Sequence, residues 1–175
     1  MKTFSMQRID EYKESDAAST LKERDHKDAT DLIVESKEGN DTDELYIVRR
    51  LTPLECERLQ GFPDGWTDLG DWTDDNGKVH KYADTPRYKA LGNSIALPFW
   101  KYLAKRICAQ YERDITMGSL FAGIGGFEYV FQHCGAIPIW SSEIEPFCQA
   151  VLKQHFPEEE EDVIECDKAG KTNLD

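Results

Sequence analysis

Five residues, Ala122-Gly-Ile-Gly-Gly126, constrain the fold more than any other stretch of the chain. The apolar segment before them, residues 115–121, is typical of a short strand, and residues 127–134 are typical of a helix. Glycine permits the sharp turn between the two, because a residue without a Cβ tolerates left-handed backbone and close approach of a ligand. The free amides at the start of the helix suit a polar or anionic ligand edge. We therefore expect an α/β unit that binds a ligand at this turn.

An acidic residue follows the turn at a suggestive distance. Glu143 lies twenty residues after Gly123, just beyond the next apolar run, residues 136–140. In dinucleotide-binding folds an acid at this place holds ribose hydroxyls. The dinucleotide fingerprint fails, however, because its third glycine would fall on Glu128. The pattern favours a nucleoside-bearing cofactor without a pyrophosphate, and the alternative of a nucleotide-dependent oxidoreductase rests on the glycine turn alone.

Composition bounds the class of protein. The chain has 175 residues, 39% of them hydrophobic, which predicts one domain with a real core. The net charge of −13 neither supports nor excludes DNA, because residues 49–113 carry slightly more basic than acidic side chains. Five cysteines without a CxxC pair predict reduced thiols and no metal site. Without an apolar run of about 18 residues, we expect a cytoplasmic protein.

Local signals predict several elements outside the glycine turn. Thr52-Pro-Leu-Glu55 has capping-box spacing and predicts a helix up to Gln60, with Gly61 ending it. Short strands are expected at residues 31–35 and 46–48, within an otherwise irregular first 44 residues. Residues 64–86 are interpreted as a surface loop with a hairpin turn at Asn76-Gly77. Two more helices are expected, from Pro98 to about Tyr111 and from Pro146 to about Phe156.

Four long stretches together resemble DNA (cytosine-5) methyltransferases. GSLFAGIGGFE (118–128) resembles the first motif of that family, and WSSEIEPFC (140–148) resembles the second. RRLTPLECERLQGFPDGW (49–66) resembles the ninth motif, and RYKALGNSIALPFW (87–100) resembles the tenth. The resemblance implies part of a doubly wound, Rossmann-like, S-adenosylmethionine-dependent methyltransferase fold. It also implies double-stranded DNA as the substrate.

The resemblance implies roles for individual residues. Those expected around S-adenosyl-L-methionine are Phe121, Ala122, Gly123, Ile124, Gly125, Gly126, Glu143, Ile144, Asn93 and Ser94. Glu143 would accept hydrogen bonds from the ribose hydroxyls, and Ile144 would cover one face of the adenine. Those expected to organise the DNA-reading scaffold are Arg49, Arg50, Arg58 and Gln60. The chain would then divide into a remnant of the target-recognition region (1–45), a scaffold (46–112), a cofactor-binding segment (113–157) and an acidic tail (158–175).

Two departures from the family qualify the resemblance. The ninth and tenth motifs precede the first and second, so we expect a circularly permuted and incomplete fold. The Pro-Cys-Gln and Glu-Asn-Val segments that carry the family's chemistry are absent, and Cys148, which follows Phe147 in a predicted helix, is not expected to replace the nucleophile. We therefore expect no catalytic residue here, an inactive isolated chain, and a complementary chain that brings the cysteine. The alternative is a degenerate fragment or an accessory protein that binds cofactor or DNA.

Overall fold

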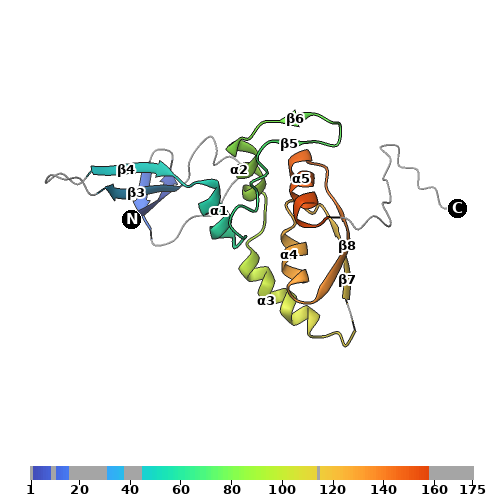
Figure 1. Cartoon of the computed structure of the whole chain (residues 1–175). Coiled ribbons are helices and arrows are strands. Elements are labelled where there is room, and N and C mark those ends of the chain that lie inside the picture. The colour runs from blue at the N-terminus through green and yellow to red at the C-terminus, as the bar shows by residue number, and fades with distance from the viewer. Residues whose placement is uncertain (1, 9–10, 16–30, 38–44, 114, 158–175) are drawn as a thin grey trace.

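The computed structural model describes residues 2–8, 11–15, 31–37, 45–113 and 115–157. Three groups of elements follow one another along the chain: an antiparallel sheet, a helical middle with a small hairpin, and a parallel strand pair with two helices (Figure 1). Within these ranges no helix is long and apolar enough to cross a membrane. The same ranges contain no cluster of three or more side chains suited to hold a metal ion.

The parallel pair carries the glycine turn. Strand β7 (Ile115–Leu120) lies beside β8 (Ala136–Ser142) in parallel, and helix α4 (Gly126–Gln132) forms the crossover between them. Helix α5 (Pro146–His155) follows β8. The predicted parallel neighbours are therefore confirmed, as is the mixed α/β class. The strand ends at Leu120, one residue earlier than expected, because Phe121 has left the extended region with a φ of 56°.

One face of this two-stranded sheet lacks a cover. Along β7 the even-numbered residues, Thr116, Gly118 and Leu120, are exposed, while the odd-numbered ones are half-buried or buried. The apolar side chains left exposed on the two strands include Leu120, Ile137, Ile139 and Trp140. Parallel sheets are normally covered on both faces, so this pair has the surface of an incomplete sheet.

Helix α1 (Pro53–Gln60) forms for the local reasons that its sequence suggests. The Thr52 hydroxyl accepts a hydrogen bond from the Glu55 amide, and the Glu55 carboxylate accepts one from the Thr52 amide at 2.8 Å. Pro53 occupies the first turn, where no amide donor is needed. Gly61 ends the helix in the left-handed region with a φ of 84°. The capping box and both helix ends are confirmed.

Helix α2 (Asp84–Gly92) corrects the interpretation of residues 64–86 as a surface loop. Its N-cap residue, Ala83, offers no side-chain acceptor, so no local signal marked its start. Trp66 and Thr67, in the same stretch, are buried in the core. The hairpin is confirmed, with β5 (Trp72–Thr73) antiparallel to β6 (Val79–His80) around Asn76-Gly77. Helix α3 (Leu97–Cys108) ends three residues before the expected Tyr111.

The first strands form a sheet that the sequence only half predicts. Strands β1 (Lys2–Arg8), β2 (Glu11–Glu14), β3 (Asp31–Lys37) and β4 (Leu45–Arg50) pair antiparallel in the order β2-β1-β3-β4. The strands expected at residues 31–35 and 46–48 are confirmed and are longer than expected. The irregular interpretation of the N-terminus is wrong for β1 and β2, which form through pairing with each other and with the distant β3. The acidic tail, residues 158–175, lies outside the described residues.

One core joins residues 46–112 to residues 115–157. Trp66 donates a hydrogen bond from Nε1 to the Ile124 carbonyl at 2.8 Å, and its ring stacks on His155 at 3.6 Å. The buried cluster around this indole draws on α1, α2, α3, α4 and α5, with members such as Cys56, Leu91, Ala104, Val130 and Val151. Residues 46–112 therefore fix the position of the glycine turn through burial of apolar surface.

Candidate cofactor-binding site

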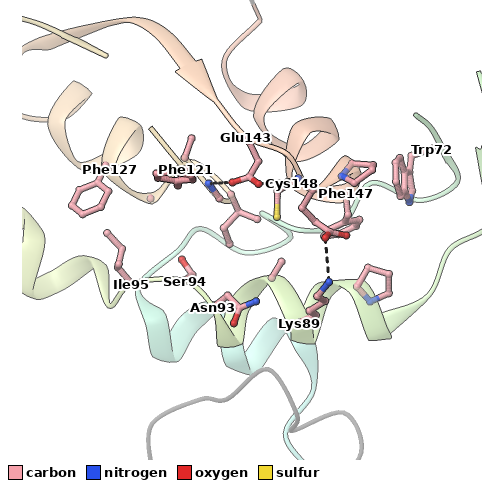
Figure 2. Close-up of a pocket in the computed structure, with 18 of the residues that line it drawn as sticks. Trp72, Lys89, Asn93, Ser94, Ile95, Phe121, Phe127, Glu143, Phe147 and Cys148 are labelled. Carbon is pink, nitrogen blue, oxygen red and sulfur yellow. Dashed lines mark hydrogen bonds and ion pairs between the residues drawn. The ribbon is translucent and has the colours of Figure 1, made fainter. Parts of the chain in front are cut away.

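A cavity of about 530 Å³ lies between α2 and the carboxyl ends of β7 and β8 (Figure 2). Lys89, Asn93 and Ser94 border it from the α2 side, while Phe121, Glu143 and Cys148 border it from the other. Of the residues expected around the cofactor, eight line this cavity: Phe121, Ala122, Gly123, Ile124, Gly126, Glu143, Asn93 and Ser94. Gly125 and Ile144 are not among the lining residues. The structure thus gathers side chains from both segments, although their role as cofactor ligands stays a prediction.

The three glycines of the turn serve different purposes. At Gly123, which has a φ of 60°, an added Cβ would meet no heavy atom within 4 Å, so the backbone there faces open space. At Gly125 an added Cβ would lie 2.5 Å from the Phe156 ring. At Gly126 it would lie 3.1 Å from Ile95. Gly123 therefore keeps the cavity open, whereas Gly125 and Gly126 let α5 and the segment before α3 pack closely against the turn.

Two large apolar side chains stand exposed beside the turn. Phe121 is 87% exposed, and Ile144 is 88% exposed. Phe121 also has a positive φ of 56°, which costs a bulky residue on the order of 1–3 kcal/mol and marks functional sites more often than ordinary turns. Exposed apolar surface held in a strained backbone suits a flat, apolar ligand group.

Glu143 is held rigidly by the backbone around it. Its Oε2 accepts a hydrogen bond from the Gly123 amide at 2.7 Å, across the ends of the two parallel strands. Its Oε1 accepts from the amides of Ile144 at 2.7 Å and Glu145 at 2.9 Å. A carboxylate offers about four acceptor sites, so these three bonds leave about one free. A ligand with two vicinal hydroxyls would have to displace one of these three amides, and two of the donors, Gly123 and Glu145, line the cavity.

Four more residues line the cavity that the sequence did not single out: Trp72, His80, Lys89 and Glu145. Trp72 of β5 stacks on His80 of β6 at 4.2 Å, and its edge meets Phe147 at 5.7 Å. Lys89 of α2 pairs with Glu145 at 3.1 Å. Trp72 could have been noticed in the sequence, because it is an aromatic residue inside an otherwise polar loop. Lys89 and Glu145 sit within the resembling motifs, but only the fold brings them together.

The Cys148 thiol borders the cavity in a protonated state. The side chain is 7% exposed, and burial, with the nearby charges of Glu143 and Glu145, raises the pKa of the thiol to about 12. A thiolate, not a thiol, is the nucleophile in covalent catalysis. Cys148 therefore has the environment of a packing residue of α5.

The four residues expected in a DNA-reading scaffold occupy different environments. Arg49 donates two hydrogen bonds of 2.8 Å to the Glu55 carboxylate. Exposed Arg58 donates two to the Asp64 carboxylate, at 2.8 and 2.6 Å. Gln60 is 8% exposed and donates to the Leu91 carbonyl at 3.3 Å, joining α1 to α2. Arg50 is exposed at the end of β4. A role of any of the four toward DNA stays a prediction.

The chain is similar in sequence to known DNA methyltransferases. The family model for C-5 cytosine-specific DNA methylases matches residues 1–109 and 115–175. The chain is 30% identical to a DNA N-6-adenine-methyltransferase of Escherichia phage P1 over 82% of its own length and 31% of that protein. It is 30% identical to the type II methyltransferase M1.ScrFI of Lactococcus lactis subsp. cremoris, over 58% of its own length and 21% of the relative. It is 32% identical to the type II methyltransferase M.SsoII of Shigella sonnei, over 51% of its own length and 18% of the relative.

The chain spans about a third or less of the length of the curated relatives that it matches. The family model, in contrast, covers nearly all of the chain, and the relatives come from bacteria and a phage. The protein belongs to the C-5 cytosine-specific DNA methylase family.

Proposed function

We propose that this chain supplies the S-adenosylmethionine cradle, and part of the DNA-facing scaffold, of a DNA cytosine-5 methyltransferase. The observation that carries the proposal is the bond between the Gly123 amide and the Glu143 carboxylate, beside an open cavity. It sets a ribose-type acid and a bare backbone segment side by side. These are the two features that a nucleoside-bearing cofactor requires.

The residues present fit that cofactor. Exposed Phe121 and Ile144 offer apolar contact to an adenine ring, and Glu143 offers its carboxylate to the ribose. The open space at Gly123 admits the rest of the cofactor to the backbone. When bound, S-adenosylmethionine supplies an electrophilic methyl group. The chain's part is to orient that group and to keep bulk water from this side of it.

The chemical step requires a segment that these 175 residues do not contain. Cytosine C5 becomes nucleophilic only after a thiolate adds to C6 of a base that has left the helical stack. Cys148 cannot act this way, because its thiol is buried with a pKa of about 12. The proposal therefore includes a complementary chain, or a further part of a longer chain, that carries Pro-Cys-Gln. The uncovered apolar face of β7 and β8 is the surface that such a segment would cover.

The order of the motifs supports a circular permutation. Helix α3 ends at Cys108, strand β7 begins at Ile115, and α3 packs against α4 of the glycine-turn unit. The family match breaks at residues 110–114, inside this short link. Ends of a fold that lie this close can be joined without disturbing its core, which is what permutation requires.

The relative from phage P1 suggests a second candidate reaction, methylation of adenine. The phage P1 relative is named for methylation of adenine N6, and the chain aligns with 31% of it. We favour cytosine C5, because the family model that covers nearly all of the chain is the cytosine-specific one. A degenerate fragment without any methyl transfer is the remaining alternative.

Calorimetric titration of the purified chain with S-adenosylhomocysteine tests the cradle. Binding is expected, and Glu143→Ala should weaken it by at least about tenfold, since hydrogen bonds to a charged group contribute about 1.5–3 kcal/mol. Glu112→Ala, at an exposed position beyond α3, is the matched control and should leave binding unchanged. Binding that Glu143→Ala does not affect would remove Glu143 from the site.

Complementation tests the reaction. The chain is mixed with a methyltransferase segment that carries Pro-Cys-Gln and Glu-Asn-Val, with labelled S-adenosylmethionine and DNA. Nucleoside analysis by mass spectrometry should then find 5-methylcytosine, lost when the partner's motif cysteine is replaced and retained with Cys148→Ser. N6-methyladenine would instead support the second reaction. Transfer by the isolated chain that Cys148→Ser abolishes would overturn the proposal.

A further inference from the structure

Helix α3 presents three exposed cationic side chains that lack a counter-charge. Lys101, Lys105 and Arg106 form no ion pair with any residue that the structure describes. Helix α3 contains no acidic residue, and α4, which packs against it, contains only Glu128, which is buried. The whole chain has a net charge of −13, but surface charges more than about 8 Å apart are largely screened at physiological salt. The three cations therefore favour an anionic partner at this place.

Two aromatic rings accompany these cations. Phe99 is 61% exposed, and Tyr102 is 58% exposed. The Tyr102 hydroxyl accepts a hydrogen bond from Nη1 of Arg106 at 2.9 Å, and the Arg106 guanidinium lies 5.7 Å from the centre of the Tyr102 ring. The Phe99 ring meets the Trp100 ring edge-on at 5.6 Å, and Trp100 meets Phe127 of α4 in the same way at 4.8 Å. Neighbouring groups thus hold both rings, while more than half of each side chain stays exposed.

The cations and the rings share one side of the helix. This side, called the outer face of α3, consists of Phe99, Lys101, Tyr102, Lys105 and Arg106. Successive residues of an α-helix are rotated by about 100°, which places all five within one half of its circumference. The other half, with Leu97 and Ala104, is buried in the core, and Figure 1 shows α3 at the border of the molecule with α4 on its inner side. None of the five residues lines the cofactor cavity.

We propose that the outer face of α3 binds single-stranded nucleic acid. Proteins that bind single strands combine cations that follow the phosphate backbone with aromatic rings on which the bases stack. The outer face supplies both. A duplex would use the cations alone, because its base faces are hidden in the helical stack. This surface is separate from the cofactor cavity and does not depend on the proposed function.

Two other anionic partners fit the outer face less well. A helix that lies in a membrane surface inserts a wide apolar face, and the apolar half of α3 is already buried in the core. An acidic peptide would pair with the cations but would leave the rings of Phe99 and Tyr102 without flat partners. Bases offer such partners together with phosphates, so a single strand uses the whole surface.

Fluorescence anisotropy of the full chain with a labelled oligonucleotide tests the proposal. A strand of about 20 nucleotides suffices, because single-strand sites span about 4–16 nucleotides. Binding is expected at low salt, with a slope of the logarithm of the binding constant against the logarithm of salt of about −2, since three phosphates of a single strand are neutralised. The double variant Phe99→Ala with Tyr102→Ala should weaken binding at least about tenfold and leave that slope unchanged.

A pair of charge variants separates the outer face from the charge of the whole chain. Lys101→Gln, Lys105→Gln and Arg106→Gln together should remove most of the salt dependence and most of the binding. The matched control has the same net charge and replaces three exposed lysines elsewhere: Lys13→Gln, Lys78→Gln and Lys81→Gln. The control should bind like the unmodified chain, and thermal unfolding should show that every variant is folded.

Four outcomes would overturn the proposal. They are equal losses in the two charge variants, binding of the same sequence as a duplex at least as strongly as the single strand, displacement of the strand by polyglutamate at equal charge concentration, and no binding by the unmodified chain at low salt. Titration with S-adenosylhomocysteine should be unchanged in all the variants of α3. Failure of nucleic-acid binding therefore leaves the proposed function standing, and loss of cofactor binding leaves this inference standing.

Discussion

Arg87 donates a hydrogen bond from Nη2 to Oε1 of Glu57 at 3.1 Å, and the two side chains are 7% and 0% exposed. This buried pair joins α2 to α1. Glu57 also accepts from the amides of Gly65 at 2.7 Å and Thr67 at 2.9 Å, and Arg87 also donates to the Thr67 hydroxyl at 3.0 Å. The pair therefore fixes the loop that carries Trp66 into the core beneath the glycine turn.

Arg87→Met should destabilise the chain by about 3–5 kcal/mol, because it leaves the buried Glu57 carboxylate without its counter-charge. Urea unfolding followed by tryptophan fluorescence measures this. Arg58→Met is the matched control: Arg58 pairs with Asp64 at the surface, and its loss should change the midpoint little. Equal effects of the two variants would contradict a structural role for the buried pair.

Glu128→Met should stabilise the chain. Glu128 of α4 is 1% exposed, and within the described residues neither carboxylate oxygen makes a well-formed hydrogen bond. Burial raises the pKa of this carboxyl, opposed in part by its own backbone amide and by Ser119. The folded state therefore holds its proton more tightly than the unfolded state, and stability falls as pH rises above the ordinary glutamate range.

The gain for Glu128→Met should be about 1–3 kcal/mol at pH 7 and smaller at acidic pH, where the native carboxyl is already neutral. Denaturant unfolding at several pH values measures it. Glu112→Met, at an exposed position, is expected to show neither the gain nor its pH dependence. A loss of stability at pH 7 would show that Glu128 has a partner that compensates its charge.

Glu55 should make the chain sensitive to acid. Its hydrogen bonds with Arg49, ahead of those with Thr52, lower the pKa of the carboxyl from 4.5 to about 2. Because the folded-state pKa is depressed, the stabilisation is complete above the unfolded-state value and is lost as pH falls from about 4.5 to about 2. Glu55→Gln should therefore be less stable than the unmodified chain at pH 6, with a difference that shrinks toward pH 2. A difference independent of pH would show that the carboxylate charge contributes nothing.

Cys148 should resist alkylation in the folded chain. Its thiol is buried and its pKa is raised to about 12, so almost no thiolate forms near pH 8. Cys134 is only partly buried and serves as the internal control. Brief iodoacetamide treatment followed by peptide mass spectrometry should label Cys134 well before Cys148, and unfolding in urea should remove the difference. Equal labelling of the two in the folded chain would mean that Cys148 is more accessible and more acidic than its surroundings dictate.

The elements whose hydrogen bonds close between near neighbours could be predicted from the sequence. The capping box of Thr52 and Glu55 spans three residues, and the Asn76-Gly77 turn joins strands a few residues apart. The glycine turn, and the parallel pairing of the strands before and after it, could likewise be predicted from one continuous stretch of sequence. The family resemblance likewise depends on contiguous stretches, and the family model confirms it.

Contacts between distant residues could not be predicted in this way. Helix α2 has no side-chain cap, and its apolar spacing is weak, so it depends on burial of Arg87, Ala90 and Leu91 against partners elsewhere in the chain. Strand β1 pairs with β3, about thirty residues away, and β2 pairs with β1. The Trp72 and His80 wall and the Lys89–Glu145 pair of the cavity arise in the same manner.

By itself the sequence determined the family, the turn that a cofactor would approach and the acid that stands beside it. Only the tertiary structure decided that Trp66 lies under the turn, that Cys148 is a buried thiol, and that Lys89 pairs with Glu145 at the cavity lining. The physical reason is that a cap or a turn draws its hydrogen bonds from adjacent residues. Burial and charge pairing depend instead on which distant surfaces exclude water from one another.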